Sequence, residues 1–234
     1  MAVITRGQQL QSGKLVNREN RFVAQVRLDN DQLITAYVPN PGRMEELMIP
    51  GSKVLVGHYP SKSRKTEYDL LVVEYNDTLV SIDTRIPNQI VELALNNKEI
   101  PEFKNYSKIK PEYTYGNSRL DFLLENKQEK CLIEVKSVTL VENKVAKFPD
   151  APTKRGRRHL EELIAAKKQG YRTAVIFIIQ RNDAREFIPH DRIDLKFAEK
   201  LRKAKNSGVE IYAYDCQITE QKIRFNIPVN VNVG

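Results

Sequence analysis

Residues 118–140, SRLDFLLENKQEKCLIEVKSVTL, decide the fold of the C-terminal half of the chain. Residues 118–125 and 131–140 are rich in apolar and β-branched side chains, as strands are. The polar run 126–129 between them, Asn-Lys-Gln-Glu, is typical of a tight turn. The stretch therefore predicts a β-hairpin.

Two carboxylates and an ammonium group meet on this predicted hairpin. Glu134 and Lys136 are two residues apart and share a face, and Asp121 on the preceding strand lies near them. Two carboxylates bind a hard divalent cation such as Mg²⁺, which polarises a phosphate and lowers the pKa of a bound water. Lys136 can orient or deprotonate that water. An ordinary ion pair would also place Glu-x-Lys on a strand, so spacing alone leaves both interpretations open.

The segments around the hairpin predict an α/β domain over residues 83–234. Apolar Ile86, Ile90 and Ala94 recur at helical spacing, and Pro87 suits a first helical turn. Further helices are predicted at about 156–169, before the capping residue Gly170, and at about 195–205. Further strands are predicted at 110–115, 172–180 and 209–216, and residues 144–158 are expected to form a loop.

The first 82 residues predict a separate β domain. Its expected strands are short and regularly spaced, at 21–28, 33–38, 53–59, 68–75 and 79–82, with one helical turn at 44–48. Such spacing is typical of a small barrel. We therefore expect two domains, 1–82 and 83–234.

Composition and charge limit the partners of the chain. The 234 residues carry a net charge of +8, which favours a polyanion. No apolar run approaches the ~20 residues that span a bilayer, and the first residues do not resemble a signal peptide, so we expect a cytoplasmic location. Cys131 and Cys216 lie in apolar strand-like stretches and are expected to be buried free thiols.

Basic residues cluster at the start of the helix predicted near residue 156. The run Lys154-Arg155-Gly156-Arg157-Arg158-His159 lies where the helix dipole also attracts phosphate, although a solvated helix start would look similar. His159 is expected to contact DNA or neighbouring side chains rather than a metal. In the barrel, Phe22, Tyr37 and Tyr59 could stack on bases or pack internally. The predicted nucleic-acid contacts are Arg21, Lys62, Arg64, Lys65, Arg119, Lys154, Arg155, Arg157, Arg158 and His159.

Several segments resemble the sugar fermentation stimulation protein (SfsA) family, and the C-terminal half is similar to the PD-(D/E)XK nuclease superfamily. The segments are NRFVAQV (20–26), VPNPGRMEELMIPG (38–51), SIDTRIPNQIVELAL (81–95), SRLDFLL (118–124), CLIEVKSVTL (131–140), FPDAPTKRGRRHLEEL (148–163) and YRTAVIFIIQR (171–181). The resemblance implies an N-terminal OB-fold barrel and a C-terminal restriction-endonuclease-like domain with a mixed sheet.

The resemblance also implies roles for single residues. Asp121, Glu134 and the backbone carbonyl of Val135 become ligands of Mg²⁺ or Mn²⁺, and Lys136 becomes the catalytic lysine. Glu92 is either a further helical ligand or a solvated side chain. Two positions depart from the expected pattern. Leu120 stands where the superfamily has proline, and Tyr37 stands where the family is expected to have histidine, so Tyr37 receives no catalytic role.

Two functions from different classes remain open at this point. The first is a metal-dependent nuclease that acts on DNA. The second is a non-catalytic, largely sequence-independent DNA-binding regulator of sugar metabolism, including maltose metabolism. Two carboxylates facing a phosphate would repel it in a pure binder, which favours the enzyme. RNA is an alternative substrate, and the sequence predicts no oligomeric state.

Overall fold

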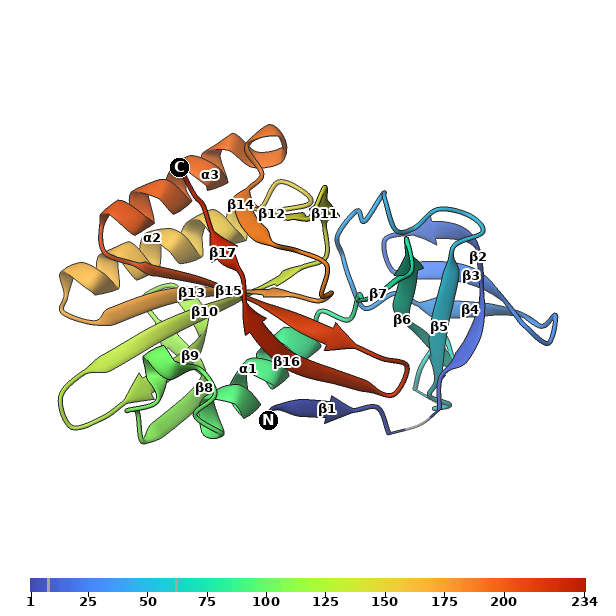
Figure 1. The fold of residues 1–234 in the computed structure, drawn as a ribbon, viewed down its shortest axis with the longest axis horizontal. Coiled ribbons are helices and arrows are strands. Elements are labelled where there is room, and N and C mark those ends of the chain that lie inside the picture. Colours follow the sequence, from blue (N-terminus) through green and yellow to red (C-terminus); the bar gives the residue numbers. More distant parts are fainter. Residues whose placement is uncertain (8, 62) are drawn as a thin grey trace.

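The computed structural model describes residues 1–7, 9–61 and 63–234, so the predicted nucleic-acid contact Lys62 lies outside the described residues. It contains a barrel and a larger α/β domain side by side (Figure 1). Within the described residues, no helix is both long enough and apolar enough to cross a membrane.

The N-terminal barrel is closed, as its strand spacing predicts. Its sheet has the order β4-β3-β2-β5-β6-β7, and an additional parallel pairing of β4 with β6 closes it. The strands are β2 (Gln11–Asn20), β3 (Val23–Leu28), β4 (Leu33–Tyr37), β5 (Lys53–His58), β6 (Tyr68–Tyr75) and β7 (Thr78–Ser81). Strand β2 was not predicted, because only Gly13 and Leu15 of its ten residues are buried and no apolar alternation marks it.

The C-terminal domain is built on a mixed seven-stranded sheet with the order β1-β16-β15-β13-β10-β9-β8. Its central strands β10, β13 and β15 are parallel, and the outer pairings are antiparallel. Strand β13 is buried from its second residue onward, as expected for a central strand covered on both faces. The strands are β1 (Val3–Thr5), β8 (Lys108–Tyr115), β9 (Ser118–Glu125), β10 (Lys130–Val138), β13 (Arg172–Ile179), β15 (Glu210–Ile218) and β16 (Lys222–Pro228).

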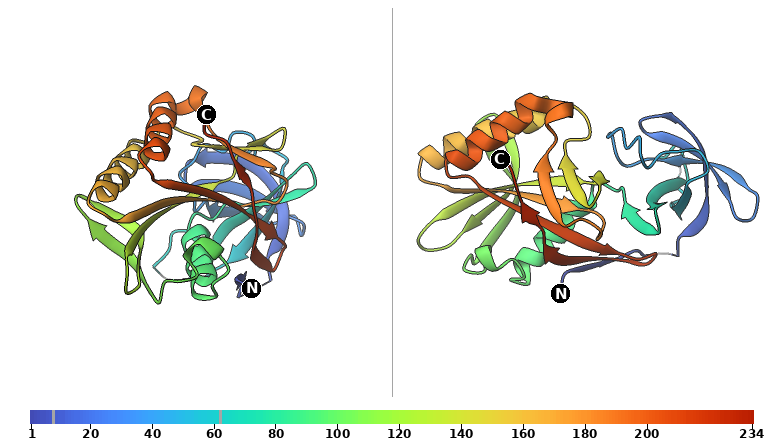
Figure 2. Two further views of the ribbon diagram at one scale, coloured as in Figure 1. Left: turned by 60° about the vertical axis from the view of Figure 1, so that its left-hand side comes forward. Right: turned by 45° about the horizontal axis from the view of Figure 1, so that its top comes forward.

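Three helices cover the two faces of this sheet. Helix α1 (Ile86–Asn96) packs on one face, and α2 (Lys154–Lys168) and α3 (Asp191–Asn206) pack on the other (Figure 2). The sequence predicted all three helices. The backbone of Asp194 is not helical, so the continuous part of α3 begins at Leu195, where its start was predicted. Gly170, with φ of +91°, ends the turn after α2 in the left-handed region.

Besides β2, other parts of the fold differ from the sequence-based expectation. Strand β1 pairs with β16, so the first residues join the C-terminal sheet although they were assigned to the barrel. A three-residue strand has too few positions to show a period. The region 144–158 is not all loop, because β12 (Val145–Phe148) belongs to a small sheet of the order β11-β12-β14-β17. The other strands of that sheet are β11 (Val141–Glu142), β14 (Glu186–Pro189) and β17 (Asn230–Val231). Strands β14, β16 and β17 were not predicted.

Hydrogen bonds with donors in both domains stabilise the junction between the barrel and the C-terminal domain. Ser81 N donates to Gln180 O (3.0 Å), and Thr84 Oγ1 donates to Pro39 O (2.8 Å). Asn40 Nδ2 in turn donates to Ile82 O (3.0 Å). The barrel loop that follows β4 is therefore held against the C-terminal domain, where it forms part of a cleft.

Candidate active site

The predicted acidic pair lies where strands β9 and β10 stop pairing. Their antiparallel ladder ends at Ile133 and Phe122, so Glu134 and Asp121 are the next positions in register. There Val135 N donates to the side-chain oxygen Oδ2 of Asp121 at 2.7 Å instead of to a backbone carbonyl of β9. A side-chain carboxylate thus takes over a backbone hydrogen bond at the fork of the hairpin.

Asp121 is held by a second donor that the sequence did not reveal. Asn88 Nδ2, on α1, donates to Asp121 Oδ1 at 2.7 Å. The two donors fix the orientation of the carboxylate. Burial raises the pKa of Asp121 first, and the negative charge of Glu134 raises it further. The signal for Asn88 was weak, because a polar residue on an amphipathic helix is usually solvated.

Glu134 is almost fully buried, with 2% of its surface exposed. Its Oε1 accepts hydrogen bonds from Lys136 Nζ and from His159 Nδ1. Burial by itself would raise the pKa of Glu134, but the charge of Lys136 and the contact with His159 outweigh burial and lower that pKa. The other oxygen, Oε2, is buried and has no hydrogen-bond partner among the described residues.

The donor set fits a divalent cation bound mainly through two carboxylates. Within the described residues, no group of three or more His, Cys, Asp or Glu side chains is arranged to hold a metal. Mg²⁺ needs no such group, because it is usually bound through one or two carboxylates and keeps several waters. A buried carboxylate oxygen without a partner is costly, and a cation would satisfy Oε2 of Glu134. Val135 lines the same cleft, and its carbonyl remains the predicted third ligand.

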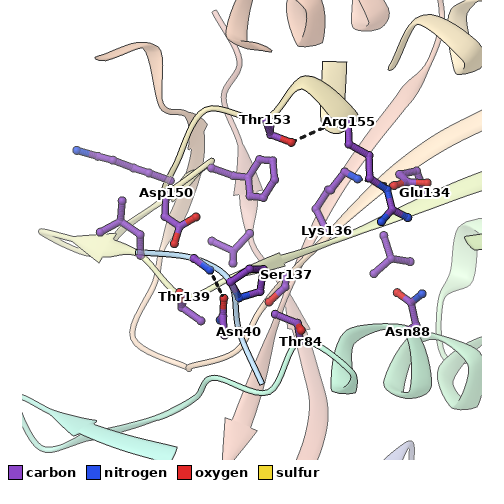
Figure 3. Close-up of a pocket in the computed structure, with 18 of the residues that line it drawn as sticks. Asn40, Thr84, Asn88, Glu134, Lys136, Ser137, Thr139, Asp150, Thr153 and Arg155 are labelled. Carbon is purple, nitrogen blue, oxygen red and sulfur yellow. Dashed lines mark hydrogen bonds and ion pairs between the residues drawn. The ribbon is translucent and has the colours of Figure 1, made fainter. Parts of the chain in front are cut away.

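A cleft of about 380 Å³ opens between the barrel and the C-terminal domain at this point (Figure 3). Asp121, Glu134 and Lys136 lie in its wall with Arg155, which extends from the start of α2. The other wall contains the barrel loop and Asp150. The loop approaches Asp150 so closely that a Cβ added to Gly42 would lie 2.2 Å from Asp150 Oδ2.

The predicted basic run at the start of α2 is divided between several environments. Arg155 lines the cleft, whereas Lys154, Arg157 and Arg158 line a separate groove beside α3. Arg157 Nη1 donates to both carboxylate oxygens of the buried Asp194, at 2.6 and 2.7 Å. His159 was predicted to contact either DNA or neighbouring side chains. It is 1% exposed and contacts the side chain of Glu134, which is the second of these alternatives.

The other predicted contacts lie away from the cleft. Arg21 and Lys65 are exposed on the barrel, and Arg64 pairs with the buried Asp69. Arg119 forms an ion pair with Glu112, with 3.4 Å between Arg119 Nη1 and Glu112 Oε2. None of these side chains lines the cleft.

Two further predictions concern a helical glutamate and the barrel aromatics. Half-buried Glu92, one turn after Asn88 on α1, does not line the cleft and stays a prediction as a metal ligand. Phe22 is 45% exposed and stacks with Tyr37 at a centroid distance of 6.4 Å.

Both cysteines, Cys131 and Cys216, are buried free thiols, as predicted.

Comparison with known families decides the relationship. Residues 16–82 match a family model described as the SfsA N-terminal OB domain, and residues 85–222 match one described as the sugar fermentation stimulation protein RE domain. The chain belongs to the SfsA family. Its barrel is thus an OB domain, as the sequence predicted, and its C-terminal half is the RE domain of the family, with the mixed sheet that was predicted.

Similar SfsA proteins match over nearly the whole chain. A homolog from Alkaliphilus metalliredigens is 46% identical over 228 residues, covering 97% of each chain. One from Clostridium kluyveri is 45% identical over 221 residues, covering 94% of this chain and 96% of its own. Both are named for sugar fermentation stimulation. The structure of Pyrococcus furiosus SfsA in complex with Ca²⁺ is 33% identical, with a TM-score of 0.90 and coverage of 99% of each chain.

Proposed function

We propose that this SfsA protein is a divalent-metal-dependent phosphodiesterase that cleaves DNA. The observation that carries the proposal is the fork of β9 and β10, where Asp121 and the unpartnered Oε2 of Glu134 stand beside Lys136. A carboxylate pair with one member buried, one half-buried and one oxygen free has little structural use, since it costs desolvation and repulsion. A site for a cation explains why the fold retains it.

Asp121, Glu134 and the carbonyl of Val135 would hold Mg²⁺ or Mn²⁺. Such a cation, when bound, polarises a phosphodiester and supplies a water of lowered pKa. The Ca²⁺ of the Pyrococcus furiosus SfsA complex supports a site for a hard, oxygen-liganded cation in this chain as well.

The remaining residues of the site orient the two carboxylates and neutralise charge on the phosphate. Asn88 Nδ2 and Val135 N fix the carboxylate of Asp121, and His159 fixes that of Glu134. The ammonium group of Lys136 lies against Glu134 and can neutralise charge that develops on the phosphate or orient the attacking water. Arg155 lines the same cleft and offers a planar guanidinium for phosphate oxygens.

The test is cleavage of labelled single-stranded, duplex and branched DNA, and of RNA, with Mg²⁺ or Mn²⁺ and with chelator. We expect metal-dependent cutting that Asp121→Ala and Lys136→Ala each reduce by about 10²-fold or more, because each removes charge that acts in the transition state. Glu112→Ala, an exposed carboxylate outside the cleft, is the matched control. Glu92→Ala tests the predicted helical ligand.

The outcomes separate the enzyme from its alternative. Cutting that survives both Asp121→Ala and Lys136→Ala would come from a contaminant and would overturn the active-site assignment. A protein that binds DNA but cuts no substrate with either metal would instead be the non-catalytic regulator. Preferential cutting of RNA would change the substrate and leave the site assignment intact.

A further inference from the structure

The cleft itself carries no surplus positive charge. Its lining contains three carboxylates, from Asp121, Glu134 and Asp150, and three cationic side chains, from Lys136, Lys147 and Arg155. A polyanion is drawn to a protein by phosphate neutralisation and counterion release, and a balanced cleft supplies little of either. Since the chain carries a net charge of +8, the surplus lies elsewhere on the surface.

A groove of about 510 Å³ between α2 and α3 carries much of this surplus. Every residue that lines it is charged. The cationic side chains are Lys154, Arg157 and Arg158 of α2 and Lys196, Lys200 and Lys203 of α3. Among the lining residues Glu161 and Glu199 oppose them, and Asp194 beneath the groove neutralises Arg157, which leaves a surplus of three positive charges.

Helical spacing explains why these charges converge. On α3, Lys196, Lys200 and Lys203 recur at i, i+4 and i+7 and form one stripe, and the basic residues of α2 at i, i+3 and i+4 share a face in the same way. The α3 stripe is about 10 Å long at 1.5 Å per residue. The helices pack through apolar residues beneath the groove, including Leu163 and Leu201, so the two sets of charges lie side by side above that contact.

Most of the cations in this groove lack an acidic partner. Arg157 is paired with Asp194, and Lys200 is paired with Glu161. In the part of the chain that the structure describes, Lys154, Arg158, Lys196 and Lys203 form no ion pair, and all four are exposed. Like charges gathered in this way repel one another, and an anionic partner would offset that cost.

We propose that the α2–α3 groove is a second nucleic-acid site, which binds the sugar–phosphate backbone without metal and without regard to base sequence. The lining offers no aromatic ring for base stacking and no apolar side chain for insertion into lipid. It offers point charges, which match a duplex that carries one negative charge per about 1.7 Å. The inference rests on the proposed function only in taking nucleic acid as the partner.

The groove and the cleft are separate, but they meet the start of α2 at neighbouring residues. Lys154 lines the groove, and Arg155, the next residue, lines the cleft. A nucleic acid bound in the cleft can therefore continue across the start of α2 onto the groove. The groove supplies affinity, while the cleft supplies the chemistry.

The test is binding of a fluorescent duplex of about 30 base pairs, and of a single strand of the same length, in the presence of chelator. A duplex of that length extends roughly 50 Å to either side of a site at its centre. The variant Lys196→Glu/Lys203→Glu is compared with Lys104→Glu/Lys127→Glu, which changes the net charge equally at exposed sites outside the groove. We expect the groove variant to bind at least about tenfold more weakly on all sequences. For Lys196→Gln/Lys203→Gln, the slope of log K against log salt should fall by about 1.8 in magnitude.

Equal losses in the groove variant and its control, or wild-type affinity in the groove variant, would overturn the proposal. Competition by phosphatidylserine vesicles as effective as that by DNA at equal phosphate would also overturn it, because the groove would then recognise any anionic surface. Thermal melting of each variant confirms that it is folded. Asp121→Ala should still bind in chelator, so a failure of the nuclease proposal leaves this test intact.

Discussion

Asp121 and Glu134 are neighbours at the fork of two strands, yet their pKa values move in opposite directions. Burial and the charge of Glu134 raise that of Asp121, whereas Lys136 and His159 outweigh burial and lower that of Glu134. The negative charge of Glu134 is thus stabilised by the ammonium group of Lys136 and the hydrogen bond from His159. Among the described residues, the hydrogen-bond donors to Asp121 are neutral, and its charge costs the metal-free protein stability.

Replacing Asp121 with asparagine should therefore stabilise the metal-free protein while abolishing cleavage. The carboxamide of Asp121→Asn can accept from Val135 N and donate to Asn88, whose own amide needs only to turn over. Because the pKa of Asp121 is raised in the folded state, its destabilising effect is present above that pKa and disappears as pH falls below the unfolded value. Melting temperatures in chelator should show a gain for the variant at neutral pH that vanishes at acidic pH.

A second prediction at this scale concerns His159, whose Nδ1 donates a hydrogen bond to the buried carboxylate of Glu134. His159→Ala removes a hydrogen bond to a charged group and leaves a cavity, so the free energy of unfolding should fall by about 2–4 kcal/mol. His159→Asn keeps a donor near the position of Nδ1 and should lose about half as much. Denaturant unfolding in chelator measures both, and equal losses would show that Glu134 does not depend on this donor.

At the scale of elements, the start of α2 positions both the cleft and the groove. Thr153 caps the helix, since its Oγ1 accepts from Gly156 N at 3.0 Å. Gly156 is required there because an added Cβ would lie 2.8 Å from Thr153 Cγ2 and 3.2 Å from Phe197 Cε2. The glycine therefore allows α2, its cap and α3 to approach closely.

Loss of this cap should be measurable. Thr153→Val keeps the shape of the side chain but removes the acceptor, and we expect the free energy of unfolding to fall by about 1 kcal/mol. Thr153→Ser retains the acceptor and should remain close to the wild type. If valine and serine were equally stable in urea unfolding, the cap would not contribute to stability.

At the scale of the whole molecule, an ion-pair network joins the barrel to the first helix of the C-terminal domain. The Arg85 guanidinium donates to Asp83 Oδ2 at 2.7 Å and to Asp69 Oδ2, on β6, at 3.2 Å. Both carboxylates are buried, and the hydrogen bond to Asp83 is the main reason that the pKa of Arg85 is raised.

Arg85→Met should loosen this junction. The side chain of Arg85 is about half exposed, so we expect a loss of about 1–3 kcal/mol, between the values for exposed and buried pairs. Arg85→Lys should lose less, because it keeps the charge but not the forked geometry. Equilibrium unfolding measures both, and a wild-type midpoint for Arg85→Met would show that the network does not stabilise the junction.

Much of this architecture followed from local patterns. The hairpin of β9 and β10, the three helices and the closed barrel each carry their own apolar period, so the sequence predicted them. Strands β1 and β2 were missed because they are held by pairing with other strands rather than by an apolar period. Asn88 was missed for a similar reason, since its role depends on a contact 33 residues away.

By itself, the sequence determined the two-domain organisation and the placing of Asp121, Glu134 and Lys136 on one hairpin, because strand period and turn chemistry act over a few residues. Only the tertiary structure decided that His159 faces Glu134, that Asn88 orients Asp121, and that the basic run of α2 divides between a cleft and a groove. Those outcomes depend on how helices and the barrel pack against the sheet. Packing joins residues far apart in the chain, and no local pattern records it.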